Sequence, residues 1–440
     1  MALSTLIINP FVHDFKLYDE WMHPLGLYLL MDALHTNGYD VRYFDCLERT
    51  GSGSNKKYAT GTFRCREIPK PALFHAIKRK YKQYGCTPEQ LRDFLDTAPH
   101  PDIIFVGSMM TYWAEGVVAT VEIIREVLPE VPVVVGGLGV RLFPEFFRRK
   151  LPDAAVYDGI LPEGSTILLP GADRPLRISA APSLLTGFSL SGAHRHGPIL
   201  LSSGCPMNCT YCASRILQPR YRRRPLETVL REVEASVEQY GCRDMAFYDD
   251  ALLVDAEKLL LPFLEKITKR WRHLRLHTPN SLHLKYLNGP LLECMFAAGF
   301  TTLRFGYESG SSRYQAQTGG KADERLLREK LALLGTYPFR DTGVYVMGGL
   351  PECSPDEMIR EMRIVASCGV TVKPVFVTPV PGTPLYHHYV HRFPELASDP
   401  HWQNDSFFIT RLEGWSTRAV EEIRVCAREM NGALHSSHTD

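Results

Sequence analysis

Three closely spaced cysteines are the residues of this 440-residue chain whose type and spacing point most directly to chemistry. Cys205, Cys209 and Cys212 form a C-x3-C-x2-C array in the segment LLSSGCPMNCTYCAS, whereas the remaining cysteines are scattered. Three thiolates from one loop can hold three corners of a cubane 4Fe-4S cluster, and a cluster with only an electron-transfer duty usually takes four. The fourth iron would then be open to a substrate or cofactor.

Two other interpretations of the array are a zinc site and a chance meeting of three core cysteines. Zinc would need a second pair of ligands, and Cys209 and Cys212 are the only cysteines with C-x2-C spacing. Gly204 and Pro206 keep the segment out of regular structure, so the array is expected in a loop. The spacing therefore favours the iron–sulfur interpretation.

The array follows the first of six strands expected in the second half of the chain. The strands are expected where β-branched or aromatic runs alternate with amphipathic helical patterns, at Ile199–Ser203, Met245–Tyr248, Leu274–His277, Thr302–Gly306, Gly343–Met347 and Val372–Val377. Six such repeats are too few for a closed eight-stranded barrel but suit a partial one.

Polar residues and tight turns follow several of these strands. In strand order, from the second to the sixth, they are Asp249 and Asp250, Asn280, Glu308, the segment from Gly348 to Glu352, and the segment TPVPGTPLY. Functional residues of barrel-type folds gather at the carboxyl ends of strands, so these residues are candidates for one site. A basic run also follows the array, at Arg220, Arg222, Arg223 and Arg224, where either a carboxylate or phosphate clamp or a solvated turn is expected.

With Tyr211 in the aromatic position before the last cysteine, the array resembles the hallmark loop of the radical S-adenosylmethionine superfamily. The resemblance implies a partial (β/α)6 barrel and a 4Fe-4S cluster on Cys205, Cys209 and Cys212. In that family the unique iron binds S-adenosylmethionine, whose reductive cleavage yields a 5'-deoxyadenosyl radical. An electron donor such as flavodoxin or ferredoxin is then needed.

The same resemblance implies further contacts with S-adenosylmethionine. Glu308 matches the position that often holds the ribose hydroxyls, and Gly348, Gly349 and Pro351 match a segment near the adenine or the methionine amino group. The other residues assigned to this cofactor are Tyr211, Asp249 and Asn280. Glu308 is alternatively a helix cap, and Asp249 and Asp250 alternatively accept hydrogen bonds from backbone amides at the next helix start.

The first 170 residues predict a parallel sheet covered by helices, a doubly wound Rossmann-like domain. Strands are expected at Leu6–Asn9, Val41–Asp45, Asp102–Val106, Val131–Val135 and Ala154–Tyr157. A helix from Pro24 to Gly38 joins the first two. Residues 51–100 interrupt the sheet, and their Lys and Arg outnumber Asp and Glu ten to four. They could face an anionic substrate, or form a solvated helical face that includes Lys78, Arg79, Lys80 and Lys82.

Taken in order, the two halves resemble the cobalamin-binding subclass of the radical S-adenosylmethionine superfamily. The resembling segments include PDIIFVGSMMTYW, VPVVVGGLGVRLFPE and DGILPEG. The residues that would then face cobalamin are Ser108, Met109, Met110, Thr111, Tyr112, Trp113, Gly136, Gly137 and Glu163. Met109, Met110 and Trp113 are alternatively core residues. The first domain has no D-x-H-x-x-G segment, so no histidine lower ligand to cobalt is expected, and a nicotinamide fingerprint is incomplete at Leu142.

Composition indicates an ordinary globular protein, with 45% hydrophobic and 22% charged residues and a formal charge of +1. No membrane span, signal peptide or nucleic-acid motif is evident, so a cytoplasmic enzyme with a small-molecule substrate is expected. The expected domains are residues 1–170, a linker at 171–197, the barrel at 198–390 and a short cap at 391–440 with a helix near Thr417–Leu434.

The function expected from these observations is cobalamin-dependent methylation of an unactivated carbon by a radical mechanism. The first alternative is a radical S-adenosylmethionine enzyme without methyl transfer, such as one catalysing a cyclisation or rearrangement. The second is a non-catalytic iron–sulfur electron carrier or sensor. Methylthiolation would need three further cluster cysteines in the first domain, and Cys46, Cys65 and Cys86 have no paired spacing and are expected to be ordinary thiols.

Overall fold

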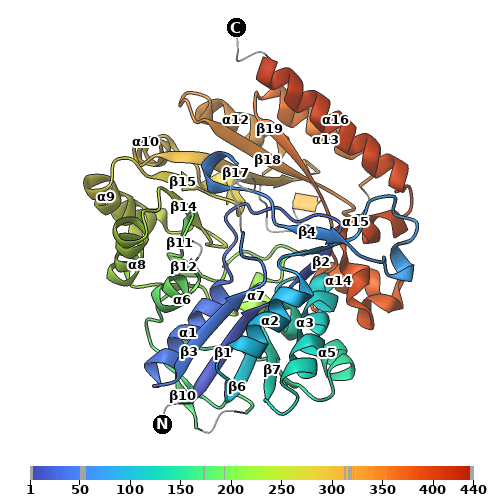
Figure 1. The fold of residues 1–440 in the computed structure, drawn as a ribbon. Coiled ribbons are helices and arrows are strands. Elements are labelled where there is room, and N and C mark those ends of the chain that lie inside the picture. Colours follow the sequence, from blue (N-terminus) through green and yellow to red (C-terminus); the bar gives the residue numbers. More distant parts are fainter. Residues whose placement is uncertain are drawn as a thin grey trace. The chain divides into compact units, whose positions relative to one another are not determined.

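The computed structural model describes two compact units (Figure 1). The described residues are 3–49, 56–171, 174–192, 194–311, 314–315, 320, 322–351 and 353–436, and side chains are described as far as residue 434. Unit 1 comprises Met1–Arg195, Glu238–Gly241 and Val390–Asn404. Unit 2 comprises His196–Val237, Cys242–Tyr389 and Asp405–Asp440.

Unit 1 is built on a five-stranded parallel sheet in the order β3-β1-β6-β7-β8. The strands are β1 (Ser4–Asn9), β3 (Asp40–Asp45), β6 (Ile103–Val106), β7 (Val133–Gly136) and β8 (Ala155–Tyr157). All five predicted strands are confirmed. Because β1 has β3 on one side and β6 on the other, the chain reverses direction across the sheet at β1 and β6, which is the topological switch point of a doubly wound fold.

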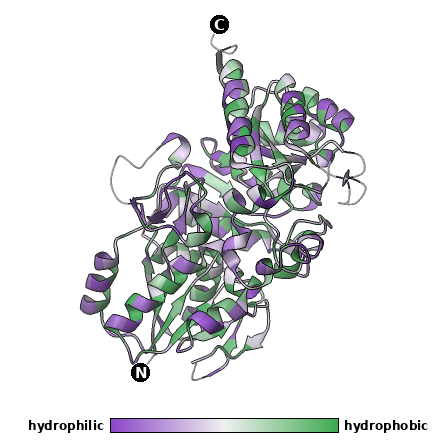
Figure 2. Ribbon diagram, turned by 90° about the vertical axis from the view of Figure 1, so that its right-hand side faces the viewer, coloured by the Kyte–Doolittle hydropathy of each residue, from purple (hydrophilic) through white to green (hydrophobic). Residues whose placement is uncertain are grey.

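Helices cover this sheet because each carries an apolar face. They are α1 (Leu25–Thr36), α3 (Ala114–Val127), α4 (Leu138–Leu142) and α5 (Pro144–Lys150). Strands β6 and β7 are apolar runs of buried residues that pack with α3 in one core cluster, as expected for a parallel sheet covered on both faces. Figure 2 shows hydrophilic and hydrophobic segments alternating along the helices.

The basic insertion forms part of a separate three-stranded antiparallel sheet in the order β2-β5-β4. Its strands are β2 (Val12–Asp14), β4 (Cys65–Glu67) and β5 (Lys82–Tyr84), followed by α2 (Pro88–Thr97). The helical face suggested for Lys78, Arg79, Lys80 and Lys82 is therefore wrong: residues 78–81 are irregular and Lys82 begins β5. Pairing with β2, distant in sequence, overrides the local charge pattern.

The segment expected as a linker contains β10 (Leu176–Arg177) and α6 (Leu185–Leu190). Helix α6 packs on α1, where the Asp32 carboxylate accepts hydrogen bonds from the Ser183 amide at 3.1 Å and the Thr186 hydroxyl at 3.2 Å. Gly187 allows this approach, because a Cβ there would lie 2.4 Å from the Tyr28 Cα. Residues 171–195 thus belong to unit 1, beyond the domain boundary predicted at residue 170.

Unit 2 contains a parallel sheet in the order β11-β14-β15-β17-β18-β19, with the short β16 (Leu282–His283) beside β17. The six strands of the main path are β11 (Gly197–Ile199), β14 (Asp244–Phe247), β15 (Arg275–His277), β17 (Phe300–Glu308), β18 (Asp341–Gly348) and β19 (Thr371–Phe376). This order confirms the predicted α/β class and the six strands of a partial barrel. Every residue of β17 is buried.

Amphipathic helices alternate with these strands. They are α8 (Leu226–Glu234), α9 (Leu260–Arg270), α10 (Gly289–Ala297), α12 (Glu324–Leu334) and α13 (Pro355–Ser367). The C-terminal helix α16 (Thr417–Ser436) packs on α13 and β19, and Asn431 hydrogen-bonds both the amide and the carbonyl of Val372. The predicted helix near Thr417–Leu434 is confirmed, and Figure 1 shows it beside α13.

The shorter elements complete the two units. In unit 1 they are η2 (Lys57–Ala59), η3 (Ala72–Phe74), η4 (Thr111–Trp113), β9 (Thr166–Ile167), η8 (Pro394–Ala397) and η9 (Pro400–Gln403). In unit 2 they include β12 (Ser202–Ser203), α7 (Ser214–Leu217), β13 (Arg222–Arg223), η6 (Ala256–Lys258), η7 (Leu284–Tyr286), α15 (Asp405–Phe408) and η10 (Ile409–Arg411). Two elements extend across the unit boundaries, η5 (Ala235–Gln239) and α14 (Pro384–Val390). Among the described helices, none combines the length and apolar character needed to span a bilayer.

Candidate functional site

The cysteine array lies in a loop whose two ends are held together. Strands β12 and β13 pair antiparallel, with Ser203 opposite Arg222, so the chain from Gly204 to Tyr221 leaves and returns at one point. Gly204 has a φ of +75°, and a Cβ there would lie 2.7 Å from the Arg220 carbonyl oxygen. Only glycine adopts this turn without strain, which explains its place immediately before the array.

Three thiols gather in this loop. Hydrogen bonds within it run from the Cys212 amide to the Cys209 carbonyl at 3.2 Å and from the Met207 amide to Cys205 Sγ at 3.4 Å. Burial is the main cause that raises the pKa of Cys205 to about 11, and the nearby Cys212, Asp250 and Cys209 contribute to this increase. A bound iron would reverse this effect, because a coordinating thiol is deprotonated.

The described residues contain no group of three His, Cys, Asp or Glu side chains arranged to hold a single metal ion. A cubane cluster places each thiolate on a different iron and so needs wider spacing than one ion does. Cys205, Cys209 and Cys212 are all partly accessible or exposed. Their donor chemistry and access therefore fit a cluster held at three corners.

Tyr211, which lies within this loop, meets Glu308 at the end of β17. The Tyr211 hydroxyl donates to Glu308 Oε1 at 3.0 Å, across 97 residues of sequence. Glu308 ends β17 with a φ of +65°, an uncommon left-handed conformation for a residue other than glycine, and its side chain is buried. Burial and then the Glu308 charge hold the pKa of Tyr211 well above its usual value. The structure thus brings two of the predicted cofactor contacts together.

The Asp249 carboxylate hydrogen-bonds the backbone immediately before the cysteine loop. Its buried carboxylate accepts hydrogen bonds from the Leu201 amide at 3.1 Å and from both the amide and the hydroxyl of Ser202 at 2.6 Å. These bonds explain why the predicted strand Ile199–Ser203 is divided into β11 and β12. Asn280 donates to the carbonyls of Tyr248 at 3.0 Å and Asp249 at 3.4 Å. Both residues position strand ends in this structure, and their roles toward S-adenosylmethionine stay predictions.

The basic run after the loop divides between two environments. Arg224 is buried and forms a two-point ion pair with Glu232 at 2.7 and 2.8 Å, so neither a clamp nor a solvated turn describes it correctly. Glu232 lies eight residues after Arg224, on the buried face of α8. This ion pair was not recognised in the sequence. Arg223 pairs with Asp255 at 2.7 Å nearer the surface, whereas Arg220 is exposed.

Gly348 and Gly349 are enclosed by side chains of unit 2. A Cβ on Gly348 would lie 2.6 Å from the Trp415 ring, and one on Gly349 would lie 2.6 Å from Ile409 Cδ1. Packing in this unit therefore already requires glycine at both positions. Pro351 is half-buried beyond them, and Glu352 lies outside the described residues. Contact of this segment with a cofactor remains a prediction.

In unit 1, the residues after β6 meet those after β7. The Ser108 hydroxyl donates to the Gly136 carbonyl at 3.0 Å and accepts from the Val140 amide at 2.9 Å. Gly137 has a φ of +103°, and a Cβ there would lie 2.4 Å from the Ser108 carbonyl oxygen. The close contact between these two backbone segments therefore explains why residue 137 is a glycine. That Gly136 and Gly137 also make room for the nucleotide tail of a corrin stays a prediction.

The side chains from Met109 to Trp113 differ in burial. Trp113 is buried and donates to Asp14 Oδ2 at 2.8 Å, and the Thr111 hydroxyl donates to Gln403 Oε1 at 2.5 Å. Met109 and Tyr112 pack partly buried against the same cluster as Trp113. The core interpretation thus holds for Trp113 and is wrong for Met110, which is 43% exposed.

Met110 and Leu138 form an exposed apolar edge at the carboxyl ends of β6 and β7. Each is 43% exposed, and Gly139 brings their segments together, since a Cβ there would lie 3.2 Å from the Met110 carbonyl oxygen. This edge adjoins the switch point, where doubly wound sheets bind ligands, and its apolar character fits the face of a large ring. Leu138 was missed in the sequence, although it follows the paired glycines directly. Glu163 lies half-buried in the turn before β9.

Comparisons with known proteins agree with this arrangement. The family model described as the radical SAM superfamily matches residues 199–365. The structure of TsrM from Kitasatospora setae, a radical S-adenosylmethionine methyltransferase solved with cobalamin and a 4Fe-4S cluster, is similar over 97% of this chain and 91% of its own, with a TM-score of 0.65 and 16% identity. The cobalamin-dependent S-adenosylmethionine radical enzyme OxsB covers 97% of this chain and 61% of its own, with a TM-score of 0.53 and 13% identity. These two likenesses establish the fold.

One curated relative matches by sequence. An uncharacterized methyltransferase of Pyrococcus horikoshii is 22% identical over 198 residues, which is 44% of this chain. The matched part spans only 42% of that relative's length.

Proposed function

From the match of residues 199–365 to the radical SAM superfamily, we propose that this chain is a cobalamin-dependent methyltransferase acting on an unactivated carbon of a small molecule. The observation that carries the proposal is the closed loop after β11 and β12, which presents three partly accessible thiols. Those thiols are Cys205, Cys209 and Cys212, and each would hold one iron of a 4Fe-4S cluster.

The remaining roles belong to residues around this loop. When bound, the cluster and S-adenosylmethionine supply a hydrogen-abstracting radical and cobalamin supplies a methyl group. Tyr211 and Glu308 would orient the ribose of S-adenosylmethionine, because their hydrogen bond holds a buried carboxylate beside the loop. Asp249 fixes the strand from which the loop starts.

In unit 1, the edge formed by Met110 and Leu138 would pack against the corrin. Its place next to the switch point supports this assignment, as does the fold shared with TsrM, which was solved with cobalamin bound. The name of the Pyrococcus horikoshii relative supports methyl transfer. A one-electron donor such as a flavodoxin or ferredoxin would reduce the cluster. The proposal also places four other residues near the corrin, together with Met110 and Leu138. They are Ser108, Thr111, Tyr112 and Glu163.

The test of the radical step is anaerobic reconstitution followed by incubation with S-adenosylmethionine and dithionite. We expect iron and sulfide near four per chain and release of 5'-deoxyadenosine. The Cys209→Ser variant is expected to lose at least about nine-tenths of both, because a three-point site cannot spare a ligand. Cys294→Ser is the matched control, since Cys294 is an exposed thiol on α10. Equal cluster content in the two variants would refute the assignment.

The test of the corrin assignment measures cobalamin retained per chain from its visible spectrum. Leu138→Glu places a charge on the apolar edge and is expected to retain less than about half of the wild-type amount. Leu190→Glu is the control, because Leu190 is 39% exposed on α6. Deoxyadenosine formation without any retained corrin would reject methyl transfer and leave the radical step intact.

A further inference from the structure

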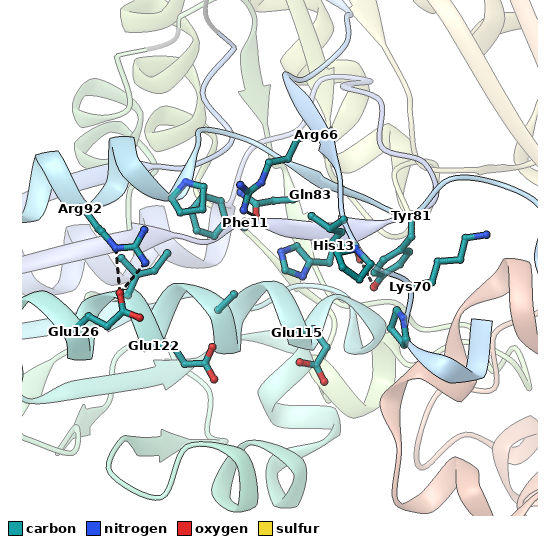
Figure 3. Close-up of a pocket in the computed structure, with 16 residues that line it drawn as sticks. Phe11, His13, Arg66, Lys70, Tyr81, Gln83, Arg92, Glu115, Glu122 and Glu126 are labelled. Atoms are coloured by element: carbon teal, nitrogen blue, oxygen red, sulfur yellow. Dashed lines mark hydrogen bonds and ion pairs between the residues drawn. The ribbon is translucent and has the colours of Figure 1, made fainter. Parts of the chain in front are cut away.

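Unit 1 contains a cavity of about 520 Å³ that the proposed function does not use (Figure 3). It lies between the antiparallel sheet β2-β5-β4 and helix α3. Its volume falls within the range of small-molecule sites. The residues that line it are Phe11, His13, Arg66, Ile68, Pro69, Lys70, Pro71, Tyr81, Gln83, Pro88, Arg92, Glu115, Ala119, Glu122, Ile123 and Glu126.

The wall formed by the sheet and the segment after β4 carries positive charge. Arg66 lies on β4, and its guanidinium donates to Gln83 Oε1 at 3.1 Å. Lys70 donates to the Ile77 carbonyl at 2.5 Å. Both cations are thus held by neutral acceptors, and neither bond cancels their charge. Figure 3 shows Arg66 and Gln83 on the side of the cavity opposite Glu122.

The wall formed by α3 carries negative charge. Glu115, Glu122 and Glu126 lie on it, and Figure 3 shows Arg92 in an ion pair with Glu126, at 2.7 Å. Glu115 has a longer contact with Lys150, at 3.9 Å. Among the described residues, Glu122 has no hydrogen bond or ion pair. Arg66 and Glu122 therefore face the cavity as opposite charges that are not neutralised by each other.

Between the charged walls the cavity is lined by neutral and apolar groups. Phe11 and Ile123 are buried, and prolines 69, 71 and 88 contribute further apolar surface. His13 also lines the cavity, and burial lowers its pKa to about 4, so its imidazole is neutral near pH 7 and adds no third charge. A ligand that matches this cavity has an apolar body with one anionic and one cationic end.

From this arrangement we propose that the cavity binds a zwitterion whose two charges lie at opposite ends of an apolar body, as in an ω-amino acid, with its carboxylate toward Arg66 and its ammonium toward Glu122. Opposite charges on facing walls select a ligand that carries both charges over one that carries either. The bidentate geometry of guanidinium suits a carboxylate. The site is distinct in its residues from the cysteine loop and from the Met110 and Leu138 edge.

The experiment measures binding to the anaerobically purified full chain by isothermal titration calorimetry at pH 7. The probe is 6-aminohexanoate, and two analogues each lack one charge: pentylamine has no carboxylate and hexanoate has no ammonium. We expect 6-aminohexanoate to bind at least about tenfold more tightly than either analogue. Binding needs neither cluster nor corrin, so its failure is distinguishable from failure of the proposed function.

Paired variants locate the site. Glu122→Gln and Arg66→Gln are each expected to weaken 6-aminohexanoate binding about fivefold, a typical effect of removing one partly exposed charge contact. Glu130→Gln and Arg64→Gln are the controls, because Glu130 follows α3 and Arg64 precedes β4 and neither lines the cavity. Absence of 6-aminohexanoate binding up to 10-millimolar concentrations, about the weak limit of specific sites, would overturn the proposal. So would equal binding of either analogue, or equal affinity in the Glu122→Gln and Arg66→Gln variants.

Discussion

A buried carboxylate beside the cysteine loop has a structural duty that is visible only in its partners. Asp249 is 3% exposed, and three donors from Leu201 and Ser202 point to it. These bonds compensate in part for the loss of water around the charge. Burial nevertheless outweighs them and raises the pKa of Asp249 from 3.8 to about 6.

This raised pKa predicts a pH-dependent stability difference between the wild type and Asp249→Asn. The folded protein keeps the proton of Asp249 at pH values where the unfolded chain loses it. The contribution of this group is therefore full below pH 3.8 and is lost as pH rises through about 6. The total corresponds to about 3 kcal/mol. Urea unfolding of both proteins between pH 4 and 7.5 should show the wild type losing stability relative to the variant, and a difference independent of pH would contradict this account.

At the scale of elements, short turns position both candidate sites. The β12 and β13 pair closes the cysteine loop, and the turns after β6 and β7 meet through Ser108. Gly137 allows that meeting, because a Cβ there would strike the Ser108 carbonyl oxygen. The atoms that such a Cβ would contact belong to the backbone of Ser108, so no flexible side chain could move aside to relieve the clash.

Replacement of Gly137 by alanine should therefore destabilise unit 1. Strain at φ +103° and the 2.4 Å contact are expected to cost about 3 kcal/mol. Gly26→Ala is the matched control, since a Cβ at Gly26 on α1 would meet nothing within 4 Å and alanine favours helix. Thermal unfolding followed by circular dichroism compares the two variants. An equal midpoint for them would show that the turn relaxes freely.

At the scale of the whole molecule, unit 1 is completed by a segment far along the chain. Residues 390–404 belong to it, and Asn404 donates to Asp14 Oδ1 at 3.1 Å across 390 residues of sequence. Asp14 also accepts from the Trp113 indole. The tail predicted as a cap over 391–440 is thus shared between the two units, with Asp405 onward in unit 2.

Loss of the hydrogen bond from Asn404 to Asp14 should destabilise the structure of unit 1 around Asp14 and Trp113. In the full chain, Asn404→Ala removes the donor to Asp14 and is expected to speed amide hydrogen exchange at Asp14 and Trp113 by about tenfold, because a buried carboxylate loses a partner. Exchange in β18 and β19 of unit 2 serves as the internal control. Unchanged exchange at Asp14 and Trp113 would mean that the tail does not stabilise unit 1.

The sequence by itself determined the features that depend on neighbouring residues. The strands follow from local apolar runs, and the array Cys205, Cys209 and Cys212 predicts an iron–sulfur cluster because all three proposed ligands lie within one loop. Helix α1 was likewise recognisable from its period and from Gly38 after its end.

Only the tertiary structure decided the pairings between distant residues. Tyr211 meets Glu308, and Asp14 meets Asn404, because the sheets bring these positions together. The insertion became strands through pairing with β2, against its local pattern. Periodicity reports which face of an element is buried, whereas the partner on that face depends on strand order and loop closure, which no local pattern encodes.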